Sequence, residues 1–105
     1  MRGDPRSSAR YVRESAVWLA RISAATCALC GRPVDMTLPR TSPAGPTVEH
    51  LIPIRRIIRM TARWDDAVAL ACDQTQWAVA HRRCQSRQGQ RASIESKMRR
   101  PSREW

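Results

Sequence analysis

Two pairs of metal-ligand side chains, each with two residues between its members, are the clearest chemical feature of this chain. Cys27 and Cys30 form the first pair, and His81 and Cys84 form the second pair far downstream. A Cys-x-x-Cys turn directs two thiolates at one ion, and Gly31 directly after it suits a tight turn. Because a Cys₃His set belongs to the known repertoire of structural zinc sites, the spacing predicts a zinc ion that staples two distant parts of the chain together.

The fourth cysteine, Cys72, is an alternative to His81 as the fourth zinc ligand. It has no partner at the two-residue spacing, and residues 67–71 before it form an apolar stretch. A free cysteine in such surroundings behaves as a small buried hydrophobe. We therefore prefer His81 as the ligand and expect Cys72 in the core. Since we see no signal peptide, we also expect reduced, metal-bound thiols in a cytoplasm rather than disulfides.

An acidic residue stands directly before a histidine between the two ligand pairs, at Glu49 and His50. A neutral imidazole near pH 7 can take a proton from water, and a carboxylate suits Mg²⁺ or Mn²⁺ as a hard oxygen ligand. The alternatives are a buried structural histidine or spare zinc ligand at His50, and a solvated surface carboxylate at Glu49. An acid and a base on a zinc-stapled loop nevertheless favour a hydrolytic site.

The charge balance points to a polyanionic partner. Lys and Arg together number 19 against 9 Asp and Glu, which gives a net charge of +10 in 105 residues, and Lys97 is the single lysine. Codon usage in a GC-rich genome accounts in part for Arg over Lys, but not for the net charge. Arg side chains match phosphate oxygens in a bidentate way, so nucleic acid is the favoured partner. The candidates for phosphate contacts are Arg55, Arg56, Arg59, Arg82, Arg83, Arg87 and Arg91.

Contacts of this kind carry little information about base sequence. For any single arginine the alternative is a solvated surface position, which we expect for about half of them. We therefore predict weak sequence preference and strong salt sensitivity, with a log–log salt slope of roughly −5 for six phosphate contacts. The four tryptophans are expected to serve packing rather than base stacking.

The elements that must position these side chains form one small domain over residues 7–98, between a disordered segment 1–6 and a basic tail 99–105. Ser7 or Ser8 can cap a helix that runs to about Ala24, and the cysteine turn follows at 27–31. Residues 33–38 read as extended, and residues 39–47 form a loop because they hold three prolines and Gly45.

A short strand is predicted at 47–50. Residues 54–73 are predicted to form two short helical pieces, with a break near Thr61. A second strand follows at 77–80. From His81 the chain reads as helical to about Met98, and Pro101 closes that helix. The most apolar stretch, 16–30, is broken by Arg21 and is too short to span a bilayer, so we expect no membrane segment.

The order of turn, strand, variable connection, strand and helix resembles the HNH endonucleases, the zinc-knuckle branch of the His-Me finger superfamily, and in particular its small phage-encoded members. The resemblance is carried by CALCGRPVD (27–35), TVEHLIP (47–53) and QWAVAHRRCQSRQG (76–89), which together define a core motif over 27–89. It implies an α+β fold: a small zinc-stapled ββα-metal (His-Me finger) domain, here with an added N-terminal helix.

The family pattern consists of an acid-His pair, a middle Asn and a final His or Asn. Glu49 and His50 match the first element, whereas Gln76 stands at the middle position and Gln85 at the final one, directly after Cys84. By resemblance, His50 is the general base, with one ring nitrogen held by a backbone carbonyl. Glu49 and Gln85 would hold a catalytic Mg²⁺ or Mn²⁺. Gln76 would hold the loop that carries Glu49 and His50 through backbone hydrogen bonds.

The resemblance implies a metal-dependent DNA endonuclease that hydrolyses phosphodiester bonds and leaves 5′-phosphate and 3′-hydroxyl ends. It also implies a terminase or other packaging protein as partner, in the host cytoplasm if the protein is phage-encoded. The alternative is a catalytically weak zinc-stapled module that binds DNA or a packaging partner, and the replacement of Asn by the longer Gln at positions 76 and 85 supports it. A purely structural zinc protein is disfavoured by the net charge.

Overall fold

A pair of antiparallel strands, β3 (Pro46–His50) and β4 (Trp77–His81), carries the predicted chemical residues. The computed structural model describes residues 3–88 and has an α+β architecture with two separate two-stranded antiparallel sheets. In β3–β4, Val48 lies opposite Val79, Pro46 opposite His81, and His50 opposite Trp77. The acid-His pair therefore lies at one end of this sheet and the metal-ligand histidine at the other end.

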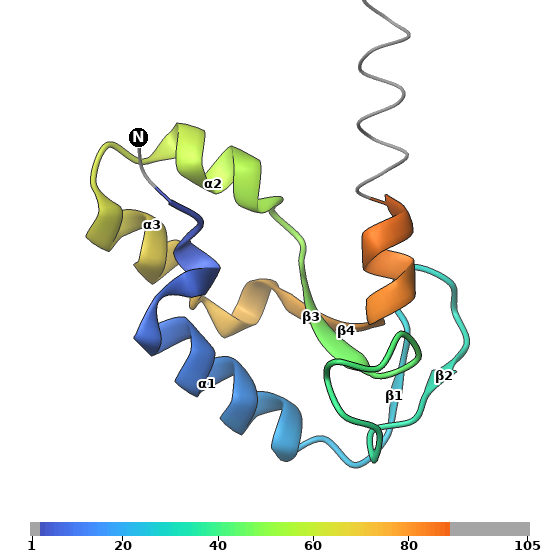
Figure 1. Cartoon of the computed structure of the whole chain (residues 1–105). Helices are drawn as coiled ribbons and strands as arrows, with labels where there is room; N and C mark the ends of the chain where they lie inside the picture. The colour runs from blue at the N-terminus through green and yellow to red at the C-terminus, as the bar shows by residue number, and fades with distance from the viewer. Residues whose placement is uncertain (1–2, 89–105) are drawn as a thin grey trace, which may run out of the picture.

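The predicted cysteine turn joins the strands of the second sheet, β1 (Ala25–Thr26) and β2 (Pro33–Val34). The amide of Ala28 donates to the carbonyl of Val79, 2.9 Å away, and this bond fastens the turn to β4. In the view of Figure 1, β1 and β2 lie to the right of β3–β4, together with a helix formed by residues 82–88. The rest of the predicted C-terminal helix, the basic tail and Arg91 lie outside the described residues.

The helices α1, α2 and α3 lie to the left of β3–β4 in Figure 1. Helix α1 (Ala9–Ala20) begins at Ser8, whose side chain accepts a hydrogen bond from the amide of Tyr11, so the predicted serine cap is confirmed. Its buried face presents Tyr11, Ser15 and Leu19. The helix ends before the predicted Ala24, because the chain turns from Arg21 towards β1.

The expectation of two helical pieces with a break near Thr61 is confirmed by α2 (Ile54–Met60) and α3 (Trp64–Ala71). A 3₁₀ turn, η2 (Gln74–Gln76), leads from α3 into β4. Cys72, at the end of α3, is 5% exposed and lies in the core, as predicted. The core also contains Trp77, which packs edge-to-face against Trp18 with ring centroids 5.3 Å apart. Over residues 3–88, every helix is too short or too polar to cross a membrane.

The N-terminal segment differs from the disordered residues 1–6 that the sequence predicts. Residues Pro5–Ser7 form a 3₁₀ helix, η1, which packs against α1 and α3, and Pro5 is buried. The Asp4 side chain caps this helix by accepting from the amide of Arg6, and proline at the first helical position is already fixed at a suitable φ. Local capping and burial of the proline ring thus order a stretch that composition alone made look unstructured.

Candidate functional site

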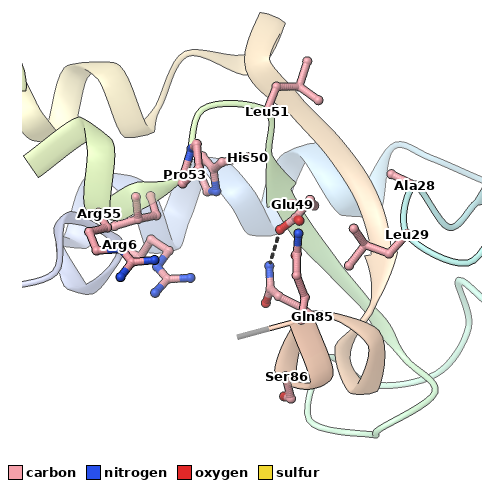
Figure 2. A pocket seen from close by; sticks show the side chains of 12 residues that line it. Arg6, Ala28, Leu29, Glu49, His50, Leu51, Pro53, Arg55, Gln85 and Ser86 are labelled. Atoms are coloured by element: carbon pink, nitrogen blue, oxygen red, sulfur yellow. Dashed lines mark hydrogen bonds between the residues drawn. The ribbon is translucent and has the colours of Figure 1, made fainter. Parts of the chain in front are cut away.

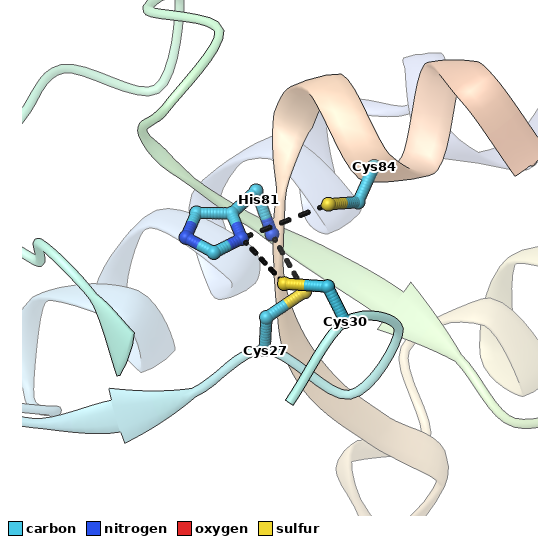
Figure 3. Close-up of side chains that lie close together, drawn as sticks. All are labelled: Cys27, Cys30, His81 and Cys84. Carbon is cyan, nitrogen blue, oxygen red and sulfur yellow. Dashed lines mark hydrogen bonds between the residues drawn. The ribbon is translucent and has the colours of Figure 1, made fainter. Parts of the chain in front are cut away.

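The four predicted zinc ligands come together from two distant segments of the chain (Figure 3). One ligand atom from each of Cys27, Cys30, His81 and Cys84 lies within 4.8 Å of all the others. His81 Nδ1 is 3.4 Å from the Cys30 sulfur and 3.7 Å from the Cys84 sulfur. Zn–S bonds of about 2.3 Å and Zn–N bonds of about 2.0 Å in a tetrahedron place sulfur and nitrogen roughly 3.5 Å apart. The cluster can therefore hold a metal ion such as zinc.

The backbone of the cysteine turn aims the sulfurs inward. Gly31 has a φ of 78°, a left-handed conformation that side chains rarely adopt, and its amide donates to the carbonyl of Cys27. The Cys27 sulfur accepts from the amides of Leu29 and His81, at 3.4 and 3.3 Å. Burial opposes ionisation of this thiol, but donation from the main chain, led by His81, lowers the pKa of Cys27 to about 6. The turn thus favours the thiolate that a metal requires.

A second contact fixes the ring of His81. Its Nε2 lies 3.1 Å from the carbonyl oxygen of Pro33, and the residue is 4% exposed. Since a carbonyl can only accept, Nε2 carries the proton and Nδ1 presents its lone pair to the sulfurs. A ligand histidine held in this way is the usual arrangement around protein-bound metals. Cys72 lies outside the cluster, so the predicted preference for His81 agrees with the geometry.

The acid-His pair opens onto a cleft of about 650 Å³ (Figure 2). The cleft lies between η1, the end of β3, the beginning of α2, the cysteine turn and the helix 82–88. Its lining consists of Arg6, Ala28, Leu29, Glu49, His50, Leu51, Pro53, Ile54, Arg55, Gln85, Ser86 and Gln88. Three of the predicted site residues, Glu49, His50 and Gln85, therefore share one cleft with the predicted phosphate ligand Arg55.

His50 contacts the carbonyl of Ala71 and the rings of Tyr11 and Trp77, the latter edge-to-face with centroids 6.2 Å apart. Its Nε2 donates to the carbonyl of Ala71, 3.1 Å away, and the same oxygen accepts from Trp77 Nε1 at 2.8 Å. The Tyr11 ring stacks on the imidazole, with centroids 5.6 Å apart and an interplanar angle of 29°. Because Nε2 bears the proton, Nδ1 is the nitrogen that can act as a base. Burial is the main cause that lowers the pKa of His50, so the ring is neutral near pH 7.

Gln85 contacts Glu49 through its nitrogen rather than its oxygen. Its Nε2 donates to the carbonyl of Val48 at 2.8 Å and to Glu49 Oε1 at 3.2 Å. Its Oε1 accepts from the hydroxyl of Thr47, 3.5 Å away. In this arrangement Gln85 orients the carboxylate. Coordination of an ion by the Gln85 oxygen, which the sequence predicts, requires the amide group to turn over.

Gln76 contributes through its main chain. Its carbonyl accepts from the amide of Leu51, the residue directly after His50, at a distance of 2.8 Å. This bond ties the end of η2 to the end of β3. Any residue at position 76 would supply this carbonyl, so the role that the resemblance implies for Gln76 stays a prediction.

The arginines predicted to contact phosphate divide into three groups. Arg55 lines the cleft, whereas Arg56 and Arg59 are exposed on α2 and line neither the cleft nor the second hollow. Arg82, Arg83 and Arg87 line a second hollow of about 320 Å³, together with Pro43 and Ser86. Ser86 borders both hollows, so the helix 82–88 separates the arginine-lined hollow from the cleft.

Sequence reasoning missed two contributors to the site, Arg6 and Tyr11. A signal for Arg6 existed, because Asp4-Pro5 is a typical helix start and would have predicted an ordered turn around it. Tyr11 has no comparable signal, since only tertiary packing brings its ring to His50. The backbone carbonyl that the resemblance implies for His50 belongs to Ala71.

Comparison with known proteins adds no assignment to this geometry. The site consists of a Cys₃His cluster and, beside it, a cleft with an oriented carboxylate and a neutral, fixed imidazole. A scan of protein-family models finds no match to the chain, and searches of curated proteins and of solved structures find none either.

Proposed function

We propose that the protein is a metal-dependent DNA endonuclease of the HNH type, built on a zinc-stapled ββα-metal unit. The observation that carries the proposal is the state of His50. Its Nε2–H is engaged by the Ala71 carbonyl, its pKa is lowered by burial, and it lines an open cleft beside Glu49. These properties suit a general base.

In this proposal, His50 Nδ1 accepts a proton from the water that attacks the phosphorus atom, while the Ala71 carbonyl and the Tyr11 ring keep the imidazole in place. Glu49 would hold the catalytic Mg²⁺ or Mn²⁺, with Gln85 orienting its carboxylate. The donor set suits such an ion where phosphate and water supply the remaining ligands. When bound, the ion would supply neutralisation of the charge that develops on the phosphate.

The arginines support DNA as the substrate. Arg55 contributes positive charge to the cleft, and Arg82, Arg83 and Arg87 contribute it to the hollow on the far side of Ser86. A strand that crosses the cleft can therefore meet cationic side chains on both sides of the scissile phosphate. Contacts of this type position a backbone without reading its sequence.

The test is conversion of supercoiled plasmid at low salt with Mg²⁺, Mn²⁺ or EDTA, with His50→Ala and His50→Gln beside the wild type. Nicked or linear DNA that requires the ion and disappears in both variants is the expected result. Melting temperatures of the variants establish that they are folded. Equal conversion by wild type and folded variants would remove His50 from the mechanism.

A second candidate is a zinc-stapled module that binds DNA or a packaging partner without cutting. It is favoured by the Gln85 contact, since Nε2 rather than Oε1 faces Glu49. Replacement by the family's residue separates the two candidates. Gln85→Asn shortens the side chain and releases the Val48 carbonyl, so under the nuclease proposal it retains or increases cleavage. A wild type and a Gln85→Asn variant that both bind DNA and leave it intact with either ion would favour the binding module.

A further inference from the structure

The N-terminal turn brings a cation into the cleft from outside the core motif. Arg6 and Asp4 flank the buried Pro5, and Arg6 lines the cleft together with Glu49, His50 and Arg55. Figure 2 shows the guanidinium of Arg6 next to Arg55, across from Glu49 and Gln85. Arg6 and Arg55 thus form the cationic side of the cleft.

The guanidinium of Arg6 is fixed along one edge. Its Nε lies 3.1 Å from both carboxylate oxygens of Asp4, and one terminal nitrogen lies 2.6 Å from Oδ2. The same carboxylate caps the turn through the amide of Arg6, at 2.8 Å. A guanidinium carries five N–H donors in a planar fork. Pairing through Nε and one terminal nitrogen therefore still presents the end of the fork to a second anion.

The charges of the turn also act on the acid-His pair. Burial is the largest cause that lowers the pKa of His50; the positive charge of Arg6 adds to it, whereas the negative charge of Asp4 opposes it. The negative charge of Glu49 in turn helps to raise the pKa of Arg6, after the larger contribution from Asp4. Arg6 is thus electrostatically linked to both members of the pair.

A contribution to folding stability does not by itself explain the Asp4–Arg6 ion pair. The side chains of Arg6 and Asp4 are 41% and 42% exposed, and exposed ion pairs contribute little to folding. Resting on the proposed nuclease function, we propose that Arg6 binds a substrate phosphate in the cleft beside His50, and that Asp4 is the positioning residue that orients its guanidinium.

The first experiment measures binding of a short fluorescent DNA duplex over a range of salt concentrations, without added divalent ion. Arg6→Gln is compared with Arg10→Gln, which removes the same charge from the exposed Arg10–Glu14 pair on α1, outside the lining of the cleft. We expect Arg6→Gln to weaken binding several-fold and to reduce the log–log salt slope by about 1, since one phosphate contact is lost. Arg10→Gln should leave the slope at its wild-type value. Equal slopes for the two variants at equal melting temperature would overturn the assignment of Arg6.

The second experiment measures Mg²⁺-dependent cleavage and tests Asp4. Asp4→Asn retains the oxygen that caps the turn but removes the charge that orients Arg6, so binding should persist while the cleavage rate at saturating DNA falls roughly tenfold, as for a lost charge-assisted hydrogen bond. Asp4→Glu should restore part of that rate. An unchanged rate for Asp4→Asn would reject the positioning role. If the wild type binds DNA without cutting it, the nuclease proposal fails, whereas the salt slopes still decide whether Arg6 contacts phosphate.

Discussion

His50 owes its chemical state to three neighbours that the chain contributes from separate elements. The Ala71 carbonyl fixes the tautomer, Tyr11 stacks on one ring face, and Trp77 meets the imidazole edge-to-face while it donates to the same carbonyl. An imidazole held in this way has lost both its rotational freedom and much of its hydration. It therefore remains neutral and in a fixed orientation beside the cleft, as the proposed general base requires.

The state of His50 predicts how the cleavage rate depends on pH below neutrality. Burial disfavours the imidazolium form, so the pKa of His50 lies below its ordinary value of 6.5. Cleavage should therefore be constant around pH 7 and fall as the pH drops through a midpoint below 6.5. The measurement is the initial rate of plasmid nicking at saturating Mg²⁺. A midpoint above the ordinary value would mean that a different group, or a protonated His50, controls the rate.

Among the elements, α1 does more than flank the core motif. Its Tyr11 is 5% exposed, stacks on His50 and meets Trp77 edge-to-face at 5.6 Å. The helix thus supplies one wall of the histidine's surroundings. The added N-terminal helix α1 is therefore a part of the site and not a separate attachment to the core motif.

The contribution of α1 can be measured with two variants of Tyr11. Tyr11→Ala leaves a cavity beside His50 and should lower the free energy of unfolding by about 3 kcal/mol or more. Tyr11→Phe retains the stacked ring and should change it little. Chemical denaturation of both variants tests this difference, and equal losses would mean that the hydroxyl, not the ring, stabilises the contact.

The cysteine turn and the helix 82–88 meet at the Cys₃His cluster, so a metal ion there would join two elements from distant parts of the chain. Removal of one ligand by Cys84→Ala should abolish stoichiometric zinc binding and lower the melting temperature sharply, because the binding energy of a structural zinc is folding energy. Cys72→Ala is the matched control, since Cys72 lies in the core and outside the cluster. It should retain the zinc content of the wild type. Equal loss of zinc in both variants would contradict the ligand set.

For the whole molecule, the net charge of +10 predicts salt-sensitive binding to a polyanion such as DNA. The described arginines of the cleft and of the second hollow lie on either side of Ser86, so they can act on one strand together. With six phosphate contacts, the log–log dependence of DNA affinity on salt should have a slope of roughly −5. Fluorescence anisotropy at several salt concentrations measures it. A slope near zero would mean that the positive side chains do not contact DNA phosphates.

Features that depend on residues close together in the sequence were predicted, whereas features that depend on tertiary contacts were not. Paired spacing correctly gave the Cys₃His cluster, because the geometry of the cysteine turn is local. Helical periodicity and a break near Thr61 likewise gave α2 and α3. The N-terminal turn was missed, since its order depends on burial of Pro5 against α1 and α3. The orientation of Gln85 depends on three neighbours in β3, and its spacing in the sequence holds no information about them.

The carbonyl of Ala71 has one further consequence. The group that anchors His50 belongs to the main chain, so no exchange of side chains can delete it, and scanning mutagenesis at position 71 would report packing alone. Residues 72–76 connect this carbonyl, at the end of α3, to β4. An insertion or deletion within residues 72–76 should therefore damage the site more than most substitutions there. Among related chains, the constant quantity would be the length of this connector and not its composition.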